Sequence, residues 1–156
     1  MREYVNGEQS FSVLKARTVK LGDPTYGQAN ILRITEDVTI DVAEGNTPAV
    51  ETTANMAPAD SIILGGTVKI LTAPGGGATA LDVGITGGGN LDGMVDGMAV
   101  TLGTEAQIGH DGDGNDTYPS QNTSAATLTL TTDSDVTTSA MSVRITLWYL
   151  TFTPPA

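Results

Sequence analysis

The chain contains one histidine, His110, so a catalytic triad or a histidine general base would have to use this residue. His110 lies in a segment rich in glycine and aspartate, and no serine stands in the G-x-S-x-G pattern of a nucleophile elbow. The absence of cysteine excludes a thiol nucleophile, thiolate metal sites and disulfide bonds. We therefore expect an exposed loop histidine and a protein that is not an enzyme.

Oxygen-bearing side chains follow His110 at nearly alternate positions, as they do at the start of a calcium-binding loop. The candidate ligands are Asp111, Asp113, Asn115 and Asp116. The pattern then fails, because its sixth position is Asp116 instead of glycine and its twelfth is Asn122 instead of glutamate. We expect a solvated acidic loop and no cofactor, with Ca²⁺ or Mg²⁺ as the alternative, since a cation would relieve the repulsion between carboxylates.

The composition predicts a single β-rich domain without a nucleic acid or membrane partner. The 156 residues include 24 Thr and 19 Gly, and β-branched threonine suits a pleated sheet better than a helix. The net charge of -11 opposes binding to nucleic acid and to anionic lipid. No apolar run is long enough to span a membrane, and no signal peptide is visible at the N-terminus.

Three stretches with apolar residues at every second position predict strands that bury one face. The predicted buried faces comprise Ile34, Val38, Ile40 and Val42 in the first stretch, Ile62, Leu64, Val68 and Ile70 in the second, and Met141, Val143, Ile145, Leu147 and Tyr149 in the third. The opposite face of the third stretch turns apolar after Thr146. This pattern predicts a strand at the centre of a sheet, buried on both sides near its end or in contact with a neighbouring subunit.

Weaker strand signals cover residues 13–21, 81–85, 98–102 and 125–131, which brings the expected number of strands to about seven. Gly- and Asp-rich segments at 73–80, 85–98 and 109–122 predict long surface loops. We therefore predict an all-β fold, a jelly-roll-like β-sandwich over residues 13–156, preceded by an N-terminal arm at 1–12. Trp148 is expected in the core or in a subunit interface.

Charge is unevenly distributed along the chain. Residues 1–33 carry a net charge of +2 and the remainder carries -13. A segment opposite in sign to its own body predicts an arm that lies across the body or docks on an acidic partner. The alternative is an ordinary strand that pairs within the same sheet.

The segment from Asp60 to Met98, DSIILGGTVKILTAPGGGATALDVGITGGGNLDGMVDGM, resembles a pattern found in small structural proteins of tailed bacteriophages. The closing strand VRITLWYLTF resembles the same group. The resemblance implies a virion component, a capsid decoration or cement protein that sits on the outer capsid surface as a homotrimer and bridges major capsid protein subunits. If that is its role, the basic residues Arg2, Lys15, Arg17 and Lys20 are the expected capsid-docking contacts.

The sequence is also compatible with other classes of function. A head-fibre or tail-fibre domain could bind a host-surface glycan through the loops at 85–98 and 109–122. An enzyme such as a depolymerase is disfavoured by the single histidine, and a secreted adhesin by the absence of a signal peptide.

Overall fold

The computed structural model describes residues 18–23, 27–41, 49–86, 91–108 and 118–153, in which all regular structure is β-strand. The strands are β1 (Thr18–Asp23), β2 (Gly27–Ile40), β3 (Ala49–Glu51), β4 (Ser61–Thr72), β5 (Gly75–Gly76), β6 (Ala80–Ile85), β7 (Val95–Ala99), β8 (Glu105–Ile108), β9 (Ser120–Asn122), β10 (Leu128–Thr132), β11 (Val136–Ser139) and β12 (Met141–Thr153). The described residues include no helix that is long and apolar enough to cross a membrane. The all-β prediction is confirmed.

Sheet A is the larger of two main antiparallel sheets and has the strand order β1-β2-β12-β4-β8, with β9 also paired to β4. Its three central strands are long, and β12 pairs with β2 along its whole length, from Met141 opposite Ile40 to Thr153 opposite Gln28. Since β12 also pairs with β4 on its other side, the predicted position of this strand at the centre of a sheet is confirmed.

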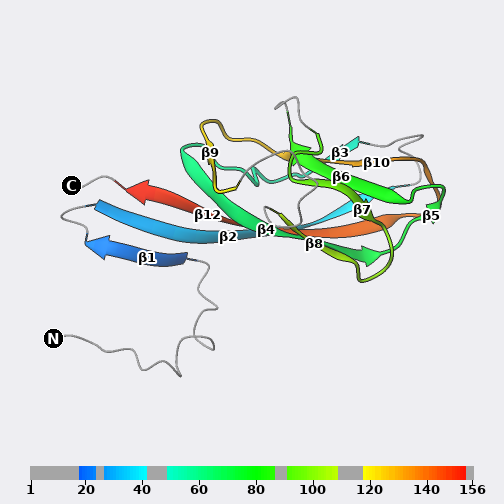
Figure 1. Cartoon of the computed structure of the whole chain (residues 1–156), viewed down its shortest axis with the longest axis horizontal. Coiled ribbons are helices and arrows are strands. Elements are labelled where there is room, and N and C mark those ends of the chain that lie inside the picture. The colour runs from blue at the N-terminus through cyan, green and yellow to red at the C-terminus, as the bar shows by residue number, and fades with distance from the viewer. Residues whose placement is uncertain (1–17, 24–26, 42–48, 87–90, 109–117, 154–156) are drawn as a thin grey trace, which may run out of the picture.

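Sheet B has the order β3-β10-β6-β7 and packs on one end of sheet A to form a β-sandwich. The strands β11 and β5 form a third, two-stranded antiparallel sheet. Figure 1 shows sheet B gathered over one end of the long strands, whereas β1, the start of β2 and the tip of β12 extend beyond it. Part of sheet A therefore projects beyond the sandwich.

The core consists of alternate residues from the facing sides of both sheets. On β12, Met141, Val143, Ile145 and Leu147 are fully buried, as their spacing predicts. Val38 and Ile40 on β2 are also buried, whereas Val42 lies outside the described residues. Sheet B contributes apolar residues of β6, β7 and β10, namely Leu81, Val83, Val95, Met98, Leu128 and Leu130.

The predicted buried face of the second stretch is wrong in its first half. Val68 and Ile70 are fully buried, but Leu64 is 38% exposed and Ile63 is buried in place of Ile62. The cause is a β-bulge, because Trp148 pairs with Gly65 while Tyr149 pairs with Ile63, which leaves Leu64 as the extra residue. One inserted residue moves every earlier side chain of β4 to the opposite face.

The weaker strand predictions had mixed outcomes. The predicted strand at 81–85 is confirmed as β6, and that at 125–131 corresponds to β10. The strand predicted at 98–102 lies earlier, at β7, because Gly103 adopts a φ of 83° and Thr104 donates a backbone hydrogen bond to the Thr101 carbonyl, which closes a turn there. The expected total of about seven strands is too low, since the short edge strands have no periodic signal.

Two acidic side chains fasten loops to the sandwich. Glu36 accepts hydrogen bonds from the backbone N–H and hydroxyl of Thr53, at 2.7 and 2.9 Å, and from the N–H of Ala54 at 2.9 Å. Asp133 accepts equivalent bonds from Thr79 and from the N–H of Ala80, at 2.6 to 3.0 Å. Each carboxylate therefore satisfies backbone donors that no strand partner reaches.

Candidate functional site

The candidate site is the outer face of sheet A, the face turned away from sheet B. Pairing across β2, β12, β4 and β8 arranges its side chains in rows, because directly opposite residues lie on the same face. The successive rows change from polar at the end of the sheet under sheet B to apolar at the projecting end. The register of the strands therefore produces an amphipathic surface on a single sheet face.

The first row is charged and consists of Asp37, Arg144, Lys69 and Glu105. Arg144 donates two hydrogen bonds of 2.7 Å to Asp37, and Lys69 lies 3.4 Å from Glu105. The hydrogen bond from Arg144 lowers the pKa of Asp37, and the same contact raises the pKa of Arg144. Two cations face two anions, so the row is electrically neutral.

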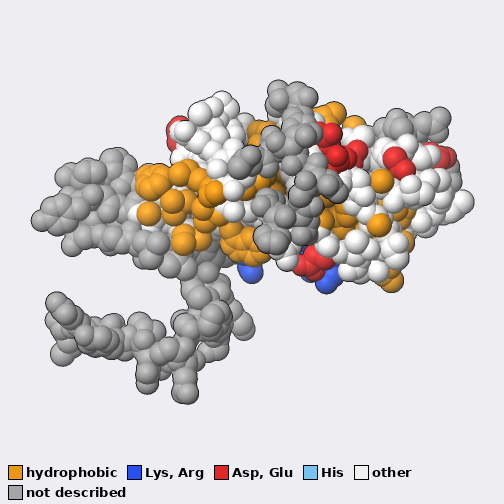
Figure 2. Space-filling view, viewed as in Figure 1, with side chains coloured by type: hydrophobic (Ala, Val, Ile, Leu, Met, Phe, Trp, Pro, Cys, Tyr) orange, Lys and Arg blue, Asp and Glu red, His pale blue; other side chains and the backbone are white. Residues whose placement is uncertain are grey.

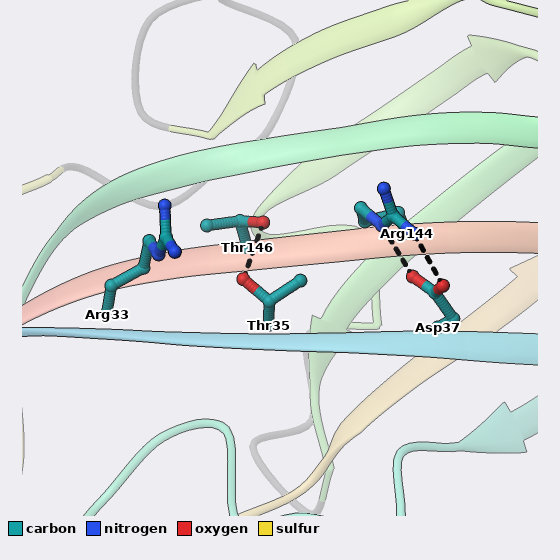
Figure 3. Close-up of a pocket in the computed structure, with 5 residues that line it drawn as sticks. All are labelled: Arg33, Thr35, Asp37, Arg144 and Thr146. Atoms are coloured by element: carbon teal, nitrogen blue, oxygen red, sulfur yellow. Dashed lines mark hydrogen bonds and ion pairs between the residues drawn. The ribbon is translucent and has the colours of Figure 1, made fainter. Parts of the chain in front are cut away.

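The second row consists of hydroxyl and amide side chains, Thr35, Thr146, Thr67 and Gln107. The hydroxyls of Thr35 and Thr146 lie 3.0 Å apart and form a hydrogen bond. Together with Arg33 and the Arg144–Asp37 pair, these hydroxyls line an open trough of about 470 Å³, shown in Figure 3. The trough is lined mainly by polar, hydrogen-bonding groups.

Arg33 pairs directly with Trp148 across β2 and β12 and marks the boundary between the polar rows and the apolar rows. It makes no ion pair with any other residue that the structure describes. In Figure 3 its guanidinium group stands apart from the hydrogen-bonded pairs drawn beside it. Arg33 is thus the uncompensated positive charge among the residues described on this face.

The projecting end of the outer face carries an apolar patch. Leu150 lies opposite Ile31 on one side and Ile62 on the other, and Phe152 lies opposite Ala29. Trp148 is 37% exposed and Phe152 is 60% exposed. The apolar patch comprises Ile31, Ile62, Leu64, Trp148, Leu150 and Phe152. Figure 2 shows hydrophobic side chains gathered over this projecting half of the molecule.

A hollow of about 410 Å³ opens beside the indole of Trp148. Its lining includes Gly65, Gly66, Thr67 and Ile108. A Cβ added to Gly66 would collide with the Thr146 carbonyl oxygen, and one added to Gly65 would lie 2.9 Å from the Ile108 carbonyl oxygen. Both glycines are therefore required by the close approach of neighbouring strands, and both line the hollow.

Charge is divided between the two sheets. The described Lys and Arg side chains, Arg33, Lys69 and Arg144, all belong to the outer face of sheet A. The strands of sheet B carry Glu51, Asp82 and Asp96 and no lysine or arginine. Figure 2 shows acidic side chains mainly over the half of the molecule where sheet B lies. Sheet B therefore faces solvent with an acidic surface.

Most of the docking, catalytic and metal-binding residues that the sequence suggests lie outside the described residues. Arg2, Lys15 and Arg17, together with His110 and the candidate metal ligands Asp111, Asp113, Asn115 and Asp116, lie outside the described residues. Lys20 belongs to β1, which pairs with β2, so this part of the basic segment forms an ordinary strand of sheet A. Within the described ranges, no group of three or more His, Cys, Asp or Glu residues could hold a metal ion.

Sequence reasoning found only one side of the outer face. The apolar residues of β12 after Thr146 were recognised, and Trp148 was expected in a core or an interface. The structure excludes the core of the single chain, because Trp148 is 37% exposed. The roles of Arg33, Gly65 and Gly66 were missed, since each depends on which residue of a neighbouring strand lies opposite.

No protein-family model matches this chain, and no curated protein matches it. Two solved chains are similar in structure. One belongs to the acidic stable capsid structure of Helicobacter pylori bacteriophage KHP30, with a TM-score of 0.49 and 8% identity over 80% of this chain and 98% of that chain. The other belongs to the capsid asymmetric unit of cyanophage Pam1, with a TM-score of 0.48 and 18% identity over 88% of this chain and 94% of that chain. At these scores and identities, neither assigns a family to this protein.

Proposed function

We propose that this chain is a structural protein of a bacteriophage virion. In this proposal it is a capsid decoration (cement) protein that binds the outer surface of the major capsid shell as a homotrimer, stabilises that shell and catalyses no reaction. The basic N-terminal segment, with Arg2, Lys15, Arg17 and Lys20, makes the capsid contacts. Neither metal nor cofactor takes part.

The observation that carries this proposal is the position of β1, the described part of the basic segment, relative to the acidic sheet B. β1 is the outermost strand of sheet A and pairs only with β2 among the described strands, so the segment joins the fold at a sheet edge. Sheet B, on the other side of the sandwich, is acidic. An edge-attached basic segment can approach an acidic partner surface while the acidic sheet faces solvent.

The sequence resemblance supports the same proposal. Its central segment, Asp60 to Met98, spans β4 to β6 and nearly all of β7, and its closing strand is β12. In the fold, β4 pairs with β12 and β6 pairs with β7. The resembling segments thus supply adjacent paired strands to both sheets, which ties the resemblance to the architecture of the sandwich.

Co-sedimentation of the purified full chain with capsids that lack it tests the proposal. We expect binding by the native chain and its loss when deletion of residues 1–12 is combined with Lys15→Glu and Arg17→Glu. Leu102→Glu is the matched control, because it adds a negative charge at an exposed position outside sheet A and should leave binding intact. Unchanged binding by the N-terminal variant would refute the docking role, and no binding by the native chain would refute the decoration role.

A head-fibre or tail-fibre domain that binds a host-surface glycan is the second candidate. One observation favours it, the exposed ring of Trp148 beside a hollow, because aromatic faces can stack on sugars. Sedimentation with host polysaccharide, in parallel with capsids, separates the two candidates. Binding to polysaccharide alone would favour the fibre.

A further inference from the structure

The apolar patch on the outer face of sheet A has no partner among the residues that the structure describes. Three of the five exposed large hydrophobic side chains in the described residues belong to it, namely Leu64, Trp148 and Phe152. The other two, Leu91 and Leu102, lie outside sheet A. A contiguous apolar patch bordered by polar rows is typical of a protein–protein interface.

We infer that the outer face binds the same face of further copies of this chain, with Phe152 of one copy inserted into the hollow beside Trp148 of the next. The inference rests on the homotrimer included in the proposed function, but not on the capsid partner. It assigns the subunit interface to a defined surface.

The shape of the face supports contact between identical copies. Phe152 protrudes with 60% of its surface exposed, and the hollow of about 410 Å³ lies on the same face, lined by Gly65, Gly66 and Trp148. A projecting aromatic side chain and a recess that can receive it are the two halves of an interface anchor. Because one chain carries both halves on one face, two or three copies can satisfy each other.

The charge distribution also favours this occupant. The chain carries a net charge of -11, and sheet B holds only acidic charged residues, so two copies repel each other at most approaches. The outer face is different, because its charged row is neutral and Arg33 adds one positive charge. Contact through the outer faces also keeps the acidic sheets far apart.

The size of the face is sufficient when the polar rows are included. Three strands spaced about 4.8 Å apart and five residues rising about 3.3 Å each give the apolar patch a projected area of roughly 240 Å². If the contact covers four strands and extends from Phe152 back to the charged row at Arg144, its projected area rises to roughly 570 Å². This value does not include the additional surface of side chains that project from the sheet. A standard interface buries about 800 Å² on each partner, so the apolar patch forms the centre and the threonine and charged rows form the rim.

Sedimentation velocity of the purified full chain, without capsids, tests the inference. At about 100 µM we expect a mass of three times the 16.0 kDa of one chain, and Phe152→Ser should weaken association by about tenfold or more. Leu102→Ser is the matched control, since Leu102 is 65% exposed outside this face and should keep the native mass. Circular dichroism and thermal melting of each variant confirm that it is folded.

A second variant separates a fitted interface from general stickiness. Thr67→Phe adds an apolar side chain on the lining of the hollow and should block the insertion of Phe152, so association falls. Non-specific hydrophobic association would instead increase. A monomeric native chain, native mass in Phe152→Ser, or stronger association in Thr67→Phe would each overturn the inference. A monomer that still co-sediments with capsids would overturn the subunit interface alone and leave the decoration role standing.

Discussion

Replacing Glu36 by glutamine is expected to loosen the junction between sheet A and the segment that follows β3. The Glu36 carboxylate accepts three hydrogen bonds of 2.7 to 2.9 Å, two from Thr53 and one from Ala54. Glutamine keeps one oxygen that can accept hydrogen bonds, and its NH₂ group then faces a backbone N–H from which it cannot accept one. At least one backbone donor therefore loses its partner within the fold.

The expected loss of stability follows from these contacts. Hydrogen bonds to a charged group contribute about 1.5 to 3 kcal/mol each when they are well shielded. Thr53 is exposed, so water screens and partly replaces the bonds, and we expect a total loss of about 1 to 2 kcal/mol for Glu36→Gln. For a chain of 156 residues this lowers Tm by about 2 to 8 °C.

The effect of Glu36→Gln depends on pH in a defined direction. Burial by itself raises the pKa of Glu36, but the hydrogen bonds from Thr53 and Ala54 outweigh it, so the pKa lies below its ordinary value of 4.5. A lowered pKa means that the stabilisation is complete above pH 4.5 and is lost as the pH falls through the pKa of the folded state. The difference between native chain and variant should therefore be constant near neutral pH and shrink in acid.

Urea unfolding followed by circular dichroism at about pH 7, 5 and 3 measures this difference. Glu105→Gln is the control, because it removes the same charge from an exposed pair with Lys69 and should cost less than about 1 kcal/mol. A Glu36→Gln loss as small as that of the control would refute the role of the carboxylate. A loss that persists unchanged in acid would refute the assignment to its ionised form.

Two further predictions concern the same sandwich. Gly66→Ala should lower the free energy of unfolding in urea by about 3 kcal/mol or more, because its Cβ meets the Thr146 carbonyl and the Leu147 side chain. Gly97→Ala, at a φ of 67° with open space around it, should lower it by only about 1 to 2 kcal/mol. Equal losses would contradict the close approach of β4 and β12. Asp133→Ala, which removes the oxygen that accepts from the Ala80 amide, should speed hydrogen exchange at that amide near neutral pH. In the native chain the hydrogen bond from the Thr79 side chain and the backbone bonds from Ala80 and Thr79 hold the pKa of Asp133 below its ordinary value of 3.8, so this protection should weaken as the pH falls through that lowered pKa. Unchanged exchange in the variant would contradict the role of the carboxylate.

The central strand could be predicted from the sequence because β12 keeps an uninterrupted period of two. Met141, Val143, Ile145 and Leu147 alternate with polar residues, and each is fully buried. No bulge interrupts its pairing with β2, so the pattern in the sequence is the pattern in the fold. Short strands such as β5 and β9, with two and three residues, hold too few side chains for any period to show.

The β4 bulge could not be predicted, because its signal is a relation between two strands. Read alone, Ile62, Leu64, Val68 and Ile70 share one parity and resemble a single buried face. The parity changes at Leu64 because Leu64 is the extra residue of the bulge opposite β12. The neighbouring Gly66 lies against β12 and Gly65 lies against β8, and only these partner strands reveal the close approaches. The glycines were visible in the sequence, but glycine also marks turns, so its role stayed ambiguous.

The same bulge explains why the candidate site could be only half predicted. β12 alone shows that Trp148, Leu150 and Phe152 share a face, and this much the sequence predicted. The inserted residue Leu64 adds an apolar side chain to that face, and the adjoining glycines line the recess beside Trp148. A recess exists where two strands place small residues beside a large one, so it follows from register and not from composition. The single extra residue in β4 therefore contributes to both features, because it brings Ile62 and Leu64 to the face of the patch and lies beside the hollow.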